Sequence, residues 1–154
     1  MFVPSHFAAA LLVGAGLMLS GPSVAAADET EAHCLALALY WEAKTEGREG
    51  MLAVASVIFN RVAHPQFPNT VCAVVEQGGR TPPCQFSWWC DGKSDRPTEP
   101  GNWASARALA AEALRQSPED RTEGALFFHN TQITNPWVRK RQRTVQIGRH
   151  IFYR

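Results

Sequence analysis

The chain has 154 residues, which is enough for one domain but not for two. Hydrophobic residues make up 45% of it and charged residues 19%, a balance that allows a globular core. The formal net charge is only +1 and no glycine-rich phosphate loop occurs, so we expect no nucleic-acid partner and no cofactor.

The N-terminal 27 residues are typical of a secretory signal. They contain no Lys, Arg, Asp or Glu, and residues 7–19 form an apolar run. Ala25 and Ala27 supply the small-residue pattern that precedes a cleavage site. A retained membrane anchor is the alternative, but the run is short for a span of about 20 residues. We therefore predict a signal peptide over 1–27 and a mature domain over 28–154. That domain is exported to the periplasm or cell wall, with no stable membrane insertion.

The first predicted helix runs from about residue 31 to residue 46 and carries two carboxylates. Leu35, Leu39, Glu42 and Glu46 recur at spacings of four, three and four, so they share one helical face. A face that begins with leucines points toward a core. We expect Glu42 to lie where the core meets a cleft, a half-dry setting that raises a carboxyl pKa and suits a general acid. Glu46, one turn further along the same face, is expected to raise the pKa of Glu42 or to bind substrate.

A solvated helix end is the alternative interpretation of this pattern. Glu46 would then pair with Lys44 or Arg48, and Glu42 would have no catalytic part. Structural ion pairs also perturb carboxylates, so the spacing alone leaves both interpretations open.

The second predicted helix, from about residue 49 to 62, is apolar nearly all round. Such a helix is central and buried. Asn60 and Arg61 at its end are its polar residues nearest the core, and we interpret them as structural caps. A proline-rich turn follows, and then a short helix over 71–77.

The segment 84–90 is the richest in aromatic residues and predicts a strand or hairpin by its alternation. Three large rings stand close together between two cysteines. Carbohydrate rings stack on aromatic faces, while Gln85 and Ser87 can hydrogen-bond hydroxyl and acetamido groups. We therefore expect Phe86 and Trp88 to bind a sugar. The alternative is that Phe86 and one tryptophan pack into the core.

The last third of the chain predicts a helix and then extended structure. An alanine-rich stretch indicates a helix over 103–116, and residues 124–128 form a buried strand. Residues 145–154 close the chain as a strand or hairpin around Gly148.

Three residues between these strands are further candidates for substrate binding. His129 and Asn130 follow the predicted strand, and Trp137 lies in a turn that would hold it at a cleft rim. A structural histidine is the alternative for His129. The basic run 139–143 is either a solvated loop or a contact for an anionic polymer such as cell wall.

The mature part contains four cysteines, Cys34, Cys72, Cys84 and Cys90. In an oxidising compartment an even set suggests two disulfides, with three possible pairings. We favour Cys84–Cys90, which closes a short loop, with Cys34–Cys72 joining the first helix to a later one.

Neither metal chemistry nor thiol chemistry is favoured. No CxxC occurs and the histidines stand singly, so we expect no metal site. A thiol enzyme that pairs one cysteine with His129 or His150 is a weaker alternative.

Taken together, these motifs resemble the SleB/CwlJ-type cell-wall hydrolases. The match covers essentially the whole mature chain, in order. Its motifs are Tyr40-x-Glu42-Ala43-x-x-Glu46, Gly50 with Ala53–Val62, His64-Pro65-x-Phe67-Pro68-Asn69-Thr70-Val71-Cys72-x-Val74-Val75, Cys84-Gln85-Phe86-Ser87, Cys90-Asp91-Gly92, Gly124-Ala125-x-x-Phe128-His129, Trp137, and Ile147-Gly148-x-His150-x-Phe152-Tyr153.

The resemblance implies a mainly α (α+β) fold, similar to the lysozyme-like catalytic domains of lytic transglycosylases, with a short β-hairpin region. It also implies peptidoglycan as substrate, cleaved between N-acetylmuramic acid and N-acetylglucosamine. The family's catalytic glutamate, the first in E-A-R-G-E, falls on Glu42. Lys44 and Thr45 stand where that segment has Arg and Gly, so the chain departs from the family there. An activating protein partner is not identifiable from the sequence.

The resemblance leaves three outcomes open. A lytic transglycosylase would use Glu42 as its single acid and base and yield 1,6-anhydro sugars. A muramidase-type hydrolase would use Glu42 with a water, as glycosidases with two carboxylates do. A non-catalytic module would only bind the wall.

Overall fold

The computed structural model describes residues 24–133 and 136–154. Residues 1–23, which hold most of the predicted signal peptide, lie outside this part. Nine elements follow in order: α1 (Val24–Ala43), α2 (Gly47–Val62), α3 (Val71–Val75), the 3-10 helix η1 (Ser87–Cys90), α4 (Pro100–Gln116), β1 (Phe127–Asn130), the 3-10 helix η2 (Pro136–Lys140), β2 (Arg143–Ile147) and β3 (His150–Tyr153). The predicted mainly helical fold with a small sheet is confirmed.

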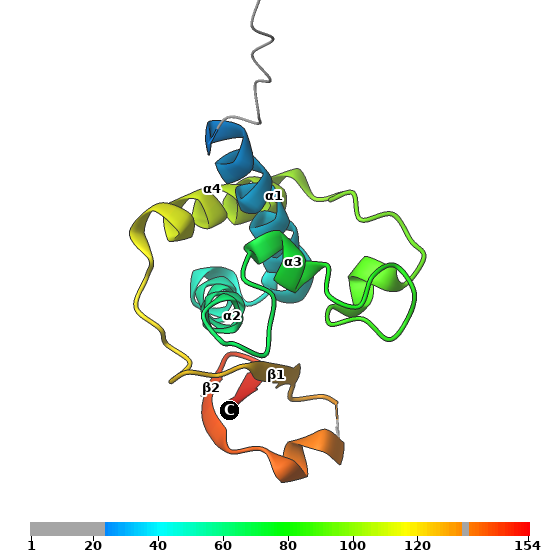
Figure 1. The fold of residues 1–154 in the computed structure, drawn as a ribbon, viewed down its shortest axis with the longest axis vertical. Helices are drawn as coiled ribbons and strands as arrows, with labels where there is room; N and C mark the ends of the chain where they lie inside the picture. Colours follow the sequence, from blue (N-terminus) through cyan, green and yellow to red (C-terminus); the bar gives the residue numbers. More distant parts are fainter. Residues whose placement is uncertain (1–23, 134–135) are drawn as a thin grey trace, which may run out of the picture.

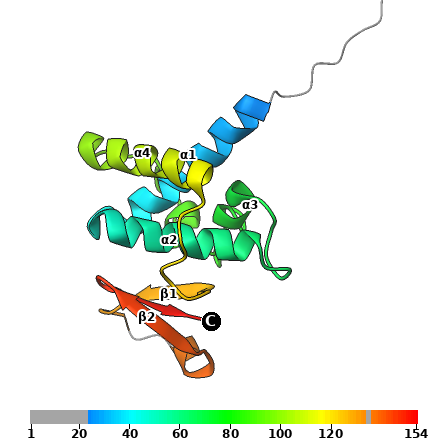
Figure 2. The ribbon, with the colours of Figure 1, turned by 90° about the vertical axis from the view of Figure 1, so that its left-hand side faces the viewer.

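The elements form three layers with α2 in the middle. Figure 2 shows α1 and α4 above α2 and the sheet below it. Residues 50–58 of α2 are buried, as the apolar pattern predicts, because helices cover one face of α2 and the sheet covers the other. One core cluster joins α2 to the other helices, and a second, of Ala53, Val57, Ala125 and Phe152, joins it to the sheet. Among the described residues, no helix is long and apolar enough to cross a membrane.

The sheet contains three antiparallel strands in the order β1-β3-β2. The predicted hairpin around Gly148 is confirmed as β2 and β3. The predicted strand at 124–128 lies later, at Phe127–Asn130, where it pairs with β3. In Figure 1 the sheet lies below α2, and the green loop that carries η1 extends to the right of α3.

The first helix differs from its prediction at both ends. It begins at Val24 and ends at Ala43, not Glu46. Gly47 has φ +67°, which a continuous α-helix cannot contain, and Glu46 turns away to meet Arg149 of the hairpin. A contact with a residue 103 positions away therefore outweighs the local helical pattern.

The strand or hairpin predicted over 84–90 is wrong. The backbone turns at Phe86, whose C=O accepts from the Trp89 N–H at 3.0 Å, and residues 87–90 form η1. Phe86 is 2% exposed and is enclosed in the core, whereas Trp88, at 8%, packs at the edge of the core against the partly exposed Trp41. The alternating pattern reflects that packing and not a pleated strand.

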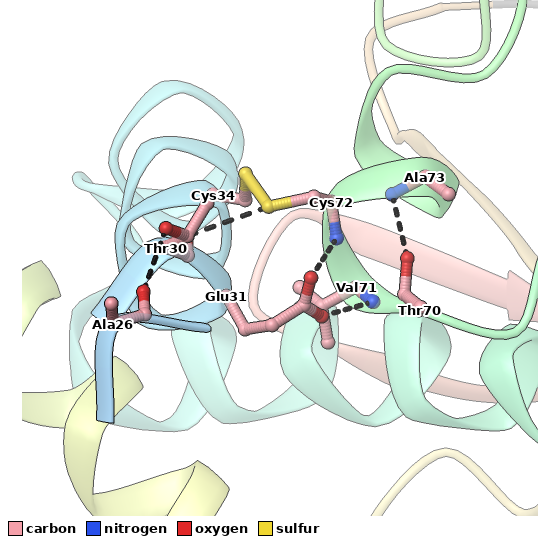
Figure 3. Close-up of a disulfide and its surroundings, with 8 residues drawn as sticks. All are labelled: Ala26, Thr30, Glu31, Cys34, Thr70, Val71, Cys72 and Ala73. Atoms are coloured by element: carbon pink, nitrogen blue, oxygen red, sulfur yellow. Dashed lines mark hydrogen bonds between the residues drawn. A yellow bond between two sulfur atoms is a disulfide. The ribbon is translucent and has the colours of Figure 1, made fainter. Parts of the chain in front are cut away.

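Both favoured disulfides are confirmed. Cys34–Cys72 joins α1 to α3 with Cα atoms 5.2 Å apart, and Cys84–Cys90 closes the η1 loop. Figure 3 shows a second tie at the first disulfide: the Glu31 carboxylate accepts from the Val71 N–H at 2.6 Å and satisfies the start of α3. All four cysteines are bonded, which leaves no thiol for the thiol-enzyme alternative.

Candidate functional site

Glu42 lies in the last turn of α1, half-buried, at the edge of the helical core. Burial raises its pKa from 4.5 to about 7, while an interaction with Trp88 and the charge of Arg61 act against that rise. The carboxyl is therefore poised to hold a proton near neutral pH and to lose it again. This is the half-dry environment that the sequence predicted for Glu42.

A wall of indole rings stands beside Glu42. Trp88 of η1 stacks on Trp41 of α1 with ring centroids 6.4 Å apart and planes 23° from parallel. The Trp41 indole N–H donates to the Asp95 carbonyl at 3.1 Å, which fixes that ring. Gln85 and Ser87 are exposed on the same loop, whereas Phe86 is buried beneath it. Trp88 is thus the predicted aromatic residue that the fold brings to Glu42.

Arg61 lies beneath this region and is only 3% exposed. Its Nε donates to the Leu126 carbonyl at 2.8 Å, and its Nη1 is buried without a hydrogen-bond partner among the described residues. The rings of Phe67, Phe86 and Phe127 surround the guanidinium, with centroids 5.3, 5.5 and 5.7 Å from Cζ. Burial lowers the pKa of Arg61 to about 10 despite the opposing effect of Glu42, so the side chain keeps its charge.

Sequence reasoning interpreted Arg61 as a helix cap and missed its place beside Glu42. A signal was present, because Val54, Ile58 and Arg61 lie four and three residues apart on one face of α2. Val54 and Ile58 are wholly buried, so the next residue on that face continues into the core.

His129, Asn130 and Trp137 come together on the sheet side. The His129 ring stacks on Tyr153, its Nε2 lies 3.0 Å from the Tyr153 hydroxyl, and its Nδ1 lies 2.8 Å from the Asn130 carbonyl. Trp137 of η2 packs edge-on against His129, with centroids 5.8 Å apart. Asn130 accepts from the Gln132 N–H at 2.9 Å and shapes the turn after β1. Phe127 links this group to the ring cage of Arg61.

Glu46 does not share a helical face with Glu42, because α1 has already ended. Its carboxylate accepts from the backbone N–H and from Nε of Arg149, at 2.9 and 2.7 Å, and its side chain is 6% exposed. Burial acts to raise the pKa of Glu46, but these bonds and the Arg149 charge outweigh it and lower the pKa. Glycine suits position 148 because its φ is +56°, and a Cβ there would also crowd the Glu46 carboxylate.

The two residues that depart from the family pattern have partners of their own. Lys44 forms an ion pair with Glu99 and lies over the Tyr40 ring, 4.6 Å from its centroid. Thr45 accepts through its hydroxyl from Arg149 Nη2 at 2.7 Å. Neither Lys44 nor Arg48 pairs with Glu46, as the solvated-helix alternative supposed. Arg48 binds Glu112 instead.

Two surface hollows in the described part of the chain lie apart from Glu42. A hollow of about 860 Å³ runs between α1 and α4, and one of about 740 Å³ lies between α1 and the start of α3; Glu42 lines neither. No cluster of three or more His, Cys, Asp or Glu residues that could hold a metal occurs in residues 24–133 and 136–154.

Comparison with known proteins matches most of this chain to a family model. The family model described as Cell Wall Hydrolase matches residues 45–153, a stretch that begins just after Glu42. Spore cortex-lytic enzymes of Bacillus subtilis strain 168 and Oceanobacillus iheyensis are 37% and 32% identical to it over 120 and 128 residues. These alignments cover 77% and 81% of this chain but only 35% and 42% of the relatives, so the chain spans less than half of their length.

Two solved structures are similar in fold as well. The catalytic domain of the germination-specific lytic transglycosylase SleB from Bacillus anthracis matches with a TM-score of 0.65 at 32% identity, covering 82% of this chain and 95% of that domain. The catalytic domain of the Bacillus cereus SleB protein matches with a TM-score of 0.64 at 31% identity, covering 92% and 100%. The resemblance seen in the sequence motifs is confirmed, and the chain belongs to the family of cell wall hydrolases.

Proposed function

We propose that this chain cleaves the glycan strands of peptidoglycan between N-acetylmuramic acid and N-acetylglucosamine, as a lytic transglycosylase. Membership of the cell wall hydrolase family and similarity to the SleB catalytic domain support this substrate. The observation that carries the proposal is the half-buried Glu42 carboxyl beside Trp88, with its pKa raised to about 7.

In the proposed reaction, Glu42 begins protonated and donates its proton to the glycosidic oxygen. The bond to the muramoyl carbon breaks and leaves an oxocarbenium-like centre. The C6 hydroxyl of the same sugar attacks that centre while the Glu42 carboxylate takes up the hydroxyl proton. A 1,6-anhydro sugar results and Glu42 is protonated again. The positive charge of Arg61 favours the carboxylate that exists between the two proton transfers.

A reaction with one carboxylate fits the surroundings of Glu42. Hydrolysis by a pair of carboxylates needs a second acid aimed at the sugar. Glu46 is committed to Arg149 and shielded from solvent, so we assign it a structural role. Hydrolysis by Glu42 with a water is the alternative outcome.

Among the expected substrate contacts, we retain the residues that frame Glu42 or line the sheet side. Phe86 is buried under the η1 loop, so we assign it to the core. The proposed contacts are Gln85, Ser87, Trp88, His129, Asn130 and Trp137.

We further propose that residues 1–27 direct export and are removed. Two disulfides support an oxidising compartment such as the periplasm. Cleavage after Ala27 would remove the first four residues of α1, from Val24 to Ala27. N-terminal sequencing of the secreted protein tests the position.

The test is mass analysis of products from purified peptidoglycan, with wild type and Glu42→Gln in parallel. Anhydro-muropeptides from the wild type and none from the variant are expected. Reducing-end products would instead assign hydrolysis. Variant activity within a few-fold of wild type would reject Glu42 as the acid. Sedimentation with the wall without release of fragments would indicate a binding module.

A further inference from the structure

Two arginines share one aromatic ring on the sheet side of the site. Arg141, which follows η2, places its Cζ 3.3 Å from the centroid of Phe127, and Arg61 lies 5.7 Å from the same centroid. Arg141 also lies 5.5 Å from the Trp137 ring. The guanidinium of Arg141 is therefore held by ring contacts and is not freely mobile.

Neither arginine forms an ion pair or a hydrogen bond with a carboxylate in the described part of the chain, although the charge of Glu42 acts on Arg61. Six other cations there, including Arg149 with Glu46, form ion pairs with carboxylates. Arg61 Nη1 and Arg141 Nε are buried and make no hydrogen bond within residues 24–133 and 136–154. Arg141 is half-buried, and its terminal nitrogens are not among the enclosed atoms and make no hydrogen bond to the described residues. Partly buried guanidinium groups without hydrogen-bond partners favour the binding of an external anion.

Glu42 does not neutralise the charges of Arg61 and Arg141. Glu42 is mostly protonated below pH about 7, so it offers little negative charge to Arg61 when poised for catalysis. The guanidinium fork matches a carboxylate in shape and charge. A glycan strand supplies carboxylates on its muramoyl residues, through either the lactyl group or the stem peptide.

We propose that Arg141, supported from below by Arg61, binds a carboxylate on the muramoyl side of the glycan strand and selects strands that carry one. This inference rests on the proposed function. It adds a specificity-determining residue outside the motifs that carry the family resemblance. The carboxylate completes the two-arginine cluster on Phe127 and aligns the strand between Trp137 and Glu42.

The test compares initial rates on three substrates: intact peptidoglycan, strands freed of stem peptides and bearing lactyl carboxylates, and strands whose carboxylates have been converted to amides. Wild type is expected to lose about tenfold or more in kcat/KM on the amidated strands, mainly through KM. Arg141→Gln should show a similar loss on carboxylate-bearing strands and little further loss on amidated ones. Arg141→Lys should fall between, because it keeps the charge without the fork.

Arg139→Gln is the matched control, since Arg139 is an exposed arginine of the same 3-10 helix. An equal loss in this variant would mean general attraction of a polyanion and would overturn the proposal. So would wild-type rates that are unchanged by amidation, a readout that needs no variant to fold. An effect on peptide-free strands assigns the lactyl carboxylate, and an effect confined to intact peptidoglycan assigns the stem peptide. A wild type that releases no fragments from any substrate refutes the proposed function instead.

Discussion

Replacing Glu42 with glutamine should stabilise the protein above neutral pH while abolishing its activity. The native pKa of Glu42 is about 7 against an ordinary value of 4.5, so the folded state binds this proton more tightly than the unfolded state. A raised native pKa contributes stability that is fully present below pH 4.5 and is lost as the pH rises to about 7. Glutamine keeps the shape of the side chain and never ionises.

The size of the effect follows from the same pKa values. The rise from 4.5 to about 7, at about 1.4 kcal/mol per pKa unit, corresponds to ~3 kcal/mol. We expect the free energy of unfolding of Glu42→Gln to equal that of wild type at pH 4 and to exceed it by up to ~3 kcal/mol at pH 8. In thermal unfolding, this is a gain on the order of 10 °C.

Urea unfolding followed by circular dichroism at a series of pH values, with both disulfides intact, measures this difference. Glu119→Gln is the control, because Glu119 is exposed and has no hydrogen bond or ion pair with the described residues. It should stay within about 0.5 kcal/mol of wild type at every pH. If the difference in unfolding free energy between Glu42→Gln and wild type does not grow between pH 5 and pH 8, the Glu42 carboxyl is well solvated. The proposed role as an acid would then lose its physical basis.

Three further predictions follow from the site and its supports. The rate on peptidoglycan should fall as the pH rises through about 7, because Glu42 loses the proton it must donate; a flat profile from pH 6 to 8 would contradict this. Glu46→Gln should cost about 2 kcal/mol in urea unfolding, because it weakens the bonds between the shielded Glu46 carboxylate and the partly exposed Arg149; a neutral result would mean that the hairpin is held otherwise. Joint replacement of Cys34 and Cys72 by serine should cost about 4 kcal/mol, given their separation of 38 residues, while calorimetry showing an unchanged Tm would refute that.

Patterns within single elements predicted well. The apolar run of residues 51–58 gave a buried central helix, and Gly148 marked the hairpin, because both signals depend on the properties of neighbouring residues. Cys34 and Cys72 also paired as expected. The position of Glu42 followed from the helical period that also buries Leu35 and Leu39.

Apart from the Cys34–Cys72 pairing, features set by contacts between distant residues did not follow from the sequence. Glu46 leaves the helix to bind Arg149, a partner that no local pattern indicates. The sequence predicts a cap at Arg61, since arginine is common at helix ends, yet three rings from separate segments enclose its guanidinium. The alternation around Phe86 resembled a strand because core packing in a 3-10 turn can also place every second ring inward.

The bond between Glu46 and Arg149 joins the corner after α1 to the tip of the β2–β3 hairpin. Glu42 lies one helical turn before that corner, so the acid and the sheet are parts of the same braced frame. These hydrogen bonds tie the acid and the sheet at one spacing, so a polymer that reaches both must fit the width that the folded protein offers.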